Sequence, residues 1–175
     1  MGEFLSNIQL VIPTSTEDLA ATSGVFREYV ISLGFDLCFQ DFEGGIANLP
    51  GDYAPPRGAL VLGHVDGAIA GCCALRPLDS SDYVNAAEMK RLYVRPAFRC
   101  LGVGRQLAEA ILDVALMAGY DSVLLDTLDD MEIARAMYEE LGFKEIPTYY
   151  HNPLAGAHYL KVDLLIRPIA GVFIA

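Results

Sequence analysis

One stretch near the middle of the chain constrains the fold more than any other. Strand-forming residues end at Val94, Pro96 stops the strand, and Gly102-Val103-Gly104 opens a segment whose apolar residues have helical spacing. A strand that leads within a few residues into a glycine-rich helix start is typical of a mixed α/β domain. We therefore expect the centre of the chain to be a strand–loop–helix unit.

The start of this expected helix has the properties of an anion site. The first backbone N–H groups of a helix are unpaired, and the helix dipole adds a partial positive charge. Five basic residues and no acidic residue lie in the run from Met89 to Arg105, namely Lys90, Arg91, Arg95, Arg99 and Arg105. A Walker loop would need Gly-Lys-Ser/Thr, and a Rossmann turn would need glycine where Leu107 stands. The stretch therefore predicts a pyrophosphate site of another kind.

The remaining pattern predicts one domain of the mixed α/β (α+β) class across residues 1–175. Expected strands lie near residues 8–12, 59–64, 68–75, 87–94, 122–127, 143–146 and 157–165. Expected helices lie near residues 17–32, 36–47, 102–118 and 131–141. The first half then reads as an antiparallel meander, and the second half alternates strands and helices. The apolar tail from Leu164 fits either packing on the domain or an interface in a homodimer.

Composition excludes several classes of partner. A formal net charge of −11 disfavours nucleic acid, although it suits a cationic substrate as well as it suits solubility. No apolar run approaches the roughly 20 residues that span a bilayer, so no membrane partner and a cytoplasmic location are expected. The four cysteines form no C-x-x-C or Cys/His cluster, so no metal site is expected.

Two ordered motifs resemble those of the GNAT acetyltransferase superfamily. The run from Leu92 to Pro96, followed by Arg99-x-x-Gly102-x-Gly104, is similar to that family's strand end and [Q/R]-x-x-G-x-[G/A] signature. Residues 134–143 are similar to its A-x-x-L-Y-x-x-L-G-F block. The specific motifs lie within residues 88–143, and the resemblance implies a GNAT-type, mostly antiparallel central sheet flanked by helices.

The resemblance also implies acetyl-CoA as co-substrate and a set of residues that bind it. These are Leu92, Tyr93, Val94, Arg99, Cys100, Leu101, Gly102, Val103, Gly104 and Arg105. The backbone of residues 92–94 is expected to bind the pantetheine arm where the strand separates from its neighbour. Many family members have glycine where this chain has Cys100, and asparagine where it has Met131. The first departure bears on phosphate binding and the second on a pantetheine hydrogen bond.

Tyr138 and Glu88 are the candidate catalytic residues. Tyr138 stands where many family members carry the tyrosine that protonates the departing thiolate, and its alternative is an aromatic ring packed under the sheet. Glu88 lies on the strand that carries the general base of several members, and its alternative is a solvated carboxylate near Lys90 and Arg91. Both alternatives stay open at this point.

Four further residues are candidates for the acceptor pocket. Asp126-Thr127 closes a strand at the carboxyl end of the sheet, where Thr127 is expected to face the acceptor amine. Tyr149 and Tyr150 are expected to line the pocket, and His151 titrates near neutral pH. Either packing or a surface position would explain these side chains equally well.

The leading functional prediction is direct transfer of an acetyl group from acetyl-CoA to a primary amine in a ternary complex. The expected acceptor is a small molecule or is amino-acid-like. A protein or peptide N-acetyltransferase is the nearest alternative enzyme. A CoA-binding sensor that has lost catalysis is the alternative from another class, and Cys100 and Met131 favour it slightly.

Overall fold

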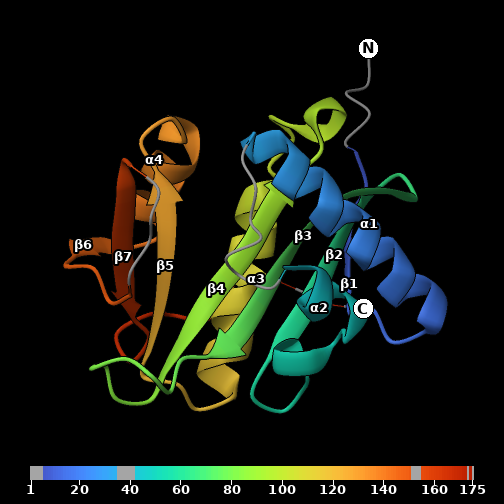
Figure 1. Cartoon of the computed structure of the whole chain (residues 1–175). Helices are drawn as coiled ribbons and strands as arrows, with labels where there is room; N and C mark the ends of the chain where they lie inside the picture. The colour runs from blue at the N-terminus through green and yellow to red at the C-terminus, as the bar shows by residue number, and fades with distance from the viewer. Residues whose placement is uncertain (1–5, 35–41, 151–154, 173, 175) are drawn as a thin grey trace.

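The computed structural model describes residues 6–34, 42–150, 155–172 and 174 (Figure 1). Its strands are β1 (Ile8–Val11), β2 (Ala59–Val65), β3 (Ala68–Pro77), β4 (Ala86–Val94), β5 (Ser122–Leu128), β6 (Lys144–Ile146) and β7 (Ala157–Asp163). Its helices are α1 (Thr16–Leu33), α2 (Phe42–Ala47), α3 (Val103–Met117) and α4 (Glu132–Glu140), with short 3-10 turns η2 (Gly51–Tyr53) and η3 (Pro96–Phe98). The predicted elements are found in this order, although residues 36–41 of the second predicted helix lie outside the described residues.

The strands form one mixed sheet in the order β1-β2-β3-β4-β5-β7-β6 (Figure 1). Every neighbouring pair is antiparallel except β4 and β5, which are parallel because α3 connects them. The predicted fold class is confirmed. The single parallel pair lies at the centre of the sheet, where the glycine-rich helix start follows β4.

The helices cover the two faces of the sheet. On one face α3 buries Leu107, Ile111 and Ala115 against the sheet, and α4 joins the same core through Tyr138 and its C-cap residue Leu141. On the other face α1 and α2 pack on β2 and β3 (Figure 1). No helix within the described ranges is both long enough and apolar enough to span a membrane.

The apolar tail returns over the domain after β7. Leu164 is fully buried, and the backbone N–H groups of Ala170 and Gly171 each donate a 3.0 Å hydrogen bond to the carboxylate of Asp113 on α3. Farther along, Ile174 forms a parallel bridge with Leu10 of β1. The tail therefore packs on its own domain, as the packing interpretation predicts.

Replacing Asp113 with alanine should destabilise the domain. Asp113 is only 5% exposed, and its loss leaves two backbone donors without their charged acceptor. We expect the free energy of unfolding to fall by about 2–3 kcal/mol, because hydrogen bonds to charged groups contribute about 1.5–3 kcal/mol. Urea denaturation would measure the change, with the exposed Asp82→Ala as the matched control. Equal stability of the two variants would show that these two hydrogen bonds do not stabilise the fold.

Candidate active site

Strands β4 and β5 diverge after Glu88, the third residue of β4. Their ladder runs only from Ala86↔Ser122 to Glu88↔Leu124. Beyond this point β4 stays paired with β3 as far as Val94, and β5 stays paired with β7 (Figure 1). The β5-facing edge of β4 therefore has no strand partner at Leu92 to Val94, the stretch predicted to bind the pantetheine arm.

A β-bulge in β4 lies beside this divergence. Arg91 has a φ of +59°, and Arg91 and Leu92 together stand opposite Cys73 of β3. The backbones approach closely here, since a Cβ atom on Gly71 would lie 2.3 Å from the carbonyl oxygen of Tyr93. After the bulge Leu92 faces the α3 core and Tyr93 faces α1. The bulge thus turns the strand where its edge becomes free.

The glycine-rich loop leads from β4 into α3. Gly102 has a φ of +85° and forms the N-cap of a helix that begins at Val103. No other atom lies within 4 Å of where a Cβ of Gly102 would stand, so a ligand can approach the backbone closely. Cys100, exposed to solvent, has a φ of +65°, a conformation that favours glycine. This explains the departure from the family motif: the cysteine adopts the backbone shape that glycine would supply.

The two predicted phosphate-binding arginines differ in their surroundings. Arg99 Nε donates to the carbonyl oxygen of Val94 at 3.0 Å, and no ion pair among the described residues includes Arg99. Arg105 instead pairs with Glu109 at 3.2 Å and with Glu140 at 2.6 Å. Arg99 is therefore the better-placed partner for a phosphate, because Arg105 would first have to leave two carboxylates.

Tyr138 lies on α4 and is 7% exposed, with its ring packed edge-on against Phe143. Burial raises the pKa of its hydroxyl well above the ordinary value, and the nearby Cys73, Tyr29 and Asp126 raise it further. Like the hydroxyl of an ordinary tyrosine, it is therefore protonated at neutral pH. The ring packs as the alternative interpretation expects, and the hydroxyl retains the proton that a general acid needs.

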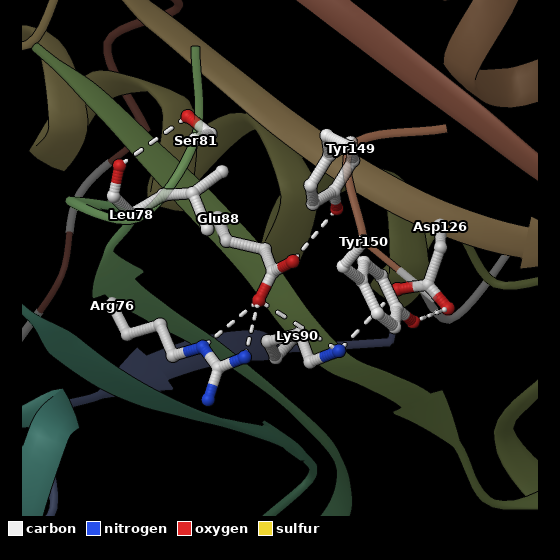
Figure 2. A network of polar contacts seen from close by, with 8 residues as sticks. All are labelled: Arg76, Leu78, Ser81, Glu88, Lys90, Asp126, Tyr149 and Tyr150. Carbon is white, nitrogen blue, oxygen red and sulfur yellow. Dashed lines mark hydrogen bonds and ion pairs between the residues drawn. The ribbon is translucent and has the colours of Figure 1, made fainter. Parts of the chain in front are cut away.

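A buried carboxylate occupies the sheet face opposite α3. Glu88 is 1% exposed, and its Oε1 accepts from Arg76, with distances of 2.8 Å to Nε and 2.7 Å to Nη2 (Figure 2). Its Oε2 accepts from the hydroxyl of Tyr149 at 2.7 Å. The alternative of a solvated carboxylate beside Lys90 and Arg91 is thus wrong, because Glu88 is buried and its main cationic partner is Arg76.

A second carboxylate, that of Asp126, lies on β5 and is linked to Glu88 through Lys90. Lys90 on β4 places its Nζ 3.3 Å from Oδ1 of Asp126 on β5 and 3.7 Å from Glu88, while the Tyr150 hydroxyl donates to Asp126 Oδ2 at 2.8 Å (Figure 2). Burial, followed by the adjacent carboxylates, raises the pKa of the Tyr149 and Tyr150 hydroxyls, so both remain donors. We call Arg76, Glu88, Lys90, Asp126, Tyr149 and Tyr150 the polar cluster.

Comparison with known proteins agrees with this geometry. The family model described as the acetyltransferase (GNAT) family matches residues 29–143. The chain belongs to the GNAT acetyltransferase family. An uncharacterized N-acetyltransferase of Schizosaccharomyces pombe is 35% identical over 91% of this chain and 96% of its own length. This GNAT chain is accordingly an N-acetyltransferase.

Two further proteins are similar to this GNAT chain, one in sequence and one in fold. N-acetylaspartate synthetase of Rattus norvegicus is 29% identical over 58% of this chain, which matches only 33% of the synthetase. The N-acetyltransferase PaiA of Thermoplasma acidophilum, solved in complex with coenzyme A, superposes with a TM-score of 0.66. It is 17% identical, and the alignment covers 90% of this chain and 99% of PaiA. The similarity to PaiA therefore shows a shared fold.

Of the residues predicted to line the acceptor pocket of this GNAT domain, two lie together and a third points to the other face of the sheet. Tyr149 and Tyr150 join Glu88 in the polar cluster. Thr127 is buried and donates to the sulfur of Met131 at 3.6 Å, on the face opposite the side chain of Asp126. His151 lies outside the described residues.

The sequence-based prediction missed Arg76, which anchors Glu88. A signal for it exists, because Arg76 is a lone cation at the end of the otherwise apolar strand Ala68–Pro77. A charged residue in such a strand is rarely buried without a partner.

Proposed function

We propose that this GNAT enzyme transfers the acetyl group of acetyl-CoA to the primary amine of a small, amino-acid-like acceptor by direct attack in a ternary complex. The divergence of β4 from β5 beyond Glu88 carries the proposal. It leaves a free edge on β4 that begins at the polar cluster and leads along the chain to the glycine-rich start of α3. Two substrates entering from opposite faces would meet there.

The residues present fit coenzyme A. Gly102 leaves open space at the helix start, where unpaired N–H groups of Val103 and Gly104 suit a pyrophosphate, and Arg99 adds a charge. The free edge of β4 from Leu92 to Val94 offers backbone hydrogen bonds to an extended pantetheine arm. Acetyl-CoA supplies a thioester, which is an activated acyl donor.

The chain offers groups for the required proton movements. Tyr138 retains its proton at neutral pH and would deliver it to the departing sulfur. The attacking amine must first lose a proton, and Glu88 is the carboxylate that the sequence assigns to this step. In the structure Glu88 is 1% exposed and Arg76 binds its Oε1, whereas Oε2 accepts only from Tyr149 and keeps a second lone pair. Proton removal would therefore use Oε2, reached through an intervening water or by movement of Tyr149.

The names of relatives support an amino-acid-like acceptor. N-acetylaspartate synthetase is named for an N-acetylated amino acid. A peptide acceptor is the alternative enzyme reading. The sensor reading is weakened because the polar cluster and Tyr138 are both in place.

Release of free CoA thiol from acetyl-CoA tests the proposal. The panel would contain free amino acids, polyamines and basic peptides, and mass spectrometry would identify the acetylated product. We expect at least one small amine to raise thiol release above the hydrolysis background. Tight acetyl-CoA binding without release for any amine would favour the sensor, and no binding would exclude acetyl-CoA as co-substrate.

The exposed Cys100 gives a second test of where CoA binds. Among the three described cysteines, Cys72 and Cys73 are buried and burial raises the pKa of both thiols, so iodoacetamide should label Cys100 first. In a Cys38→Ser background, saturating acetyl-CoA should slow this labelling about ten-fold or more, because the occupied loop excludes the reagent. Intact-mass time courses would follow it, with glutathione in the same mixture as a control for reagent loss. Unchanged labelling would place the CoA phosphates away from Cys100.

A further inference from the structure

A cavity of about 300 Å³ lies between the sheet and the segment that contains α2 and η2. Its apolar part includes the rings of Phe26, Phe42 and Tyr53. Two arginines, Arg76 from β3 and Arg91 from β4, also line it. Asp52, exposed on η2, is the acidic residue of the lining. The cavity is thus a small aromatic pocket with two guanidinium groups.

The two arginines are not equivalent. Arg76 is neutralised by Glu88 of the polar cluster, so the cavity and the cluster share this side chain. Arg91 takes part in no ion pair among the described residues, and its buried Nε has no hydrogen-bond partner. Its guanidinium carbon lies 5.0 Å from the centre of the Phe42 ring. A cation with an unpaired buried donor is costly unless a ligand supplies the acceptor, at about 1–3 kcal/mol for the donor alone.

The position of Arg91 follows from the β-bulge. Its φ of +59° is a conformation that a non-glycine residue adopts at an energetic cost, and bulges often redirect a side chain beside an active site. Arg91 directly precedes Leu92, the first residue of the free edge proposed to hold the pantetheine arm. Arg76 lines the same cavity and pairs with Glu88, so a group bound to Arg91 would lie beside the polar cluster.

We propose that Arg91 binds the carboxylate of the acceptor, and that the acceptor is a free α-amino acid held by its own carboxylate in this cavity. The inference rests on the proposed function and specifies its substrate class. A guanidinium binds a carboxylate through two parallel N–H donors, and an α-amino acid carries its amine one carbon from that carboxylate. The aromatic rings then receive the amino-acid side chain.

The positive charge of Arg91 is opposite in sign to the net charge of the whole chain. The formal net charge of −11 favours cationic ligands at long range. Contacts inside a partly buried cavity are screened less than surface charges, so the unneutralised Arg91 decides which end of an amphoteric substrate enters. The amine of the amino acid would then be held on the side of Glu88 and Asp126, the two carboxylates of the otherwise charge-balanced polar cluster.

Matched pairs of acceptors test this proposal directly. Each free L-amino acid would be compared with its primary amide and with a dipeptide that begins with it, by thiol release and by calorimetric binding to CoA-loaded protein. We expect kcat/KM for the preferred amino acid to exceed that of its amide at least ten-fold. Arg91→Gln should remove this preference by raising KM, and Arg91→Lys should restore part of it. Arg57→Gln, which removes an exposed charge paired with Asp79, is the matched control.

The outcomes separate this inference from the proposed function. Equal use of amino acid and amide, or preference for the dipeptide, would overturn the carboxylate assignment and leave acetyl transfer standing. Unchanged KM in Arg91→Gln would overturn the role of Arg91. Absence of thiol release with every amine, together with acetyl-CoA binding, would overturn the proposed function itself.

Discussion

Replacing Tyr138 with phenylalanine is expected to lower kcat by about two to four orders of magnitude, the range for loss of a general acid. The ring would still pack against Phe143, since only the hydroxyl is removed. A tyrosine hydroxyl is protonated at neutral pH, and burial raises the pKa of this one further. Affinity for acetyl-CoA should stay unchanged, because a group that acts only in the transition state contributes little to ground-state binding. Steady-state kinetics and calorimetry would measure the two quantities.

Tyr120→Phe is the matched control for this substitution. Tyr120 is 4% exposed and donates its hydroxyl to the carbonyl oxygen of Arg57, away from the residues assigned to the site. The control should lose about 1 kcal/mol of stability for one hydrogen bond and keep its kcat. If Tyr138→Phe behaves in the same way as Tyr120→Phe, Tyr138 is a packing residue and another group protonates the sulfur.

The order of elements and the loop at the start of α3 were predictable because their signals are local. Pro96, Gly102 and the spacing of Leu107 and Ile111 specify a strand end and a helix start within a short stretch of chain. The motif that resembles the GNAT signature lies in this stretch. The reason that Cys100 can replace the usual glycine was not predictable, because it lies in the positive φ of Cys100, and the residue type alone does not specify a backbone conformation.

The polar cluster was only partly predictable because its contacts join distant segments. Arg76 and Glu88 are opposite one another in the β3–β4 register, and a bulge later in that ladder shifts the register for Arg91. Glu88 is buried and neutralised because β3 and β4 pair in this register. The residue types alone do not specify that register. Strand alternation would have separated Asp126 from Thr127, since neighbouring residues on β5 point to opposite faces.

Replacing Glu88 with glutamine is expected to lower the free energy of unfolding by about 3 kcal/mol, the lower part of the range for breaking a buried ion pair. Glu88 is 1% exposed, whereas the Arg76 side chain is 36% exposed and regains some solvent, which reduces the loss. The Lys90 side chain is only 10% exposed and would keep Asp126 as its partner. Urea denaturation would measure the change, with the exposed Glu43→Gln, partner of Arg27, as the control.

A double-mutant cycle with Arg76→Met identifies what Glu88 contributes. If Glu88 mainly holds Arg76, its replacement should cost less stability in the Arg76→Met background, with a coupling energy of about 1–3 kcal/mol. Because Glu88 is buried and paired with Arg76, which also lines the acceptor cavity, we expect the kinetic effect of Glu88→Gln to fall mostly on KM for the acceptor. A fall in kcat with loss of the acidic limb of its pH profile, at unchanged stability, would instead make Glu88 the general base. The cycle therefore separates a positioning carboxylate from a catalytic one at the same residue.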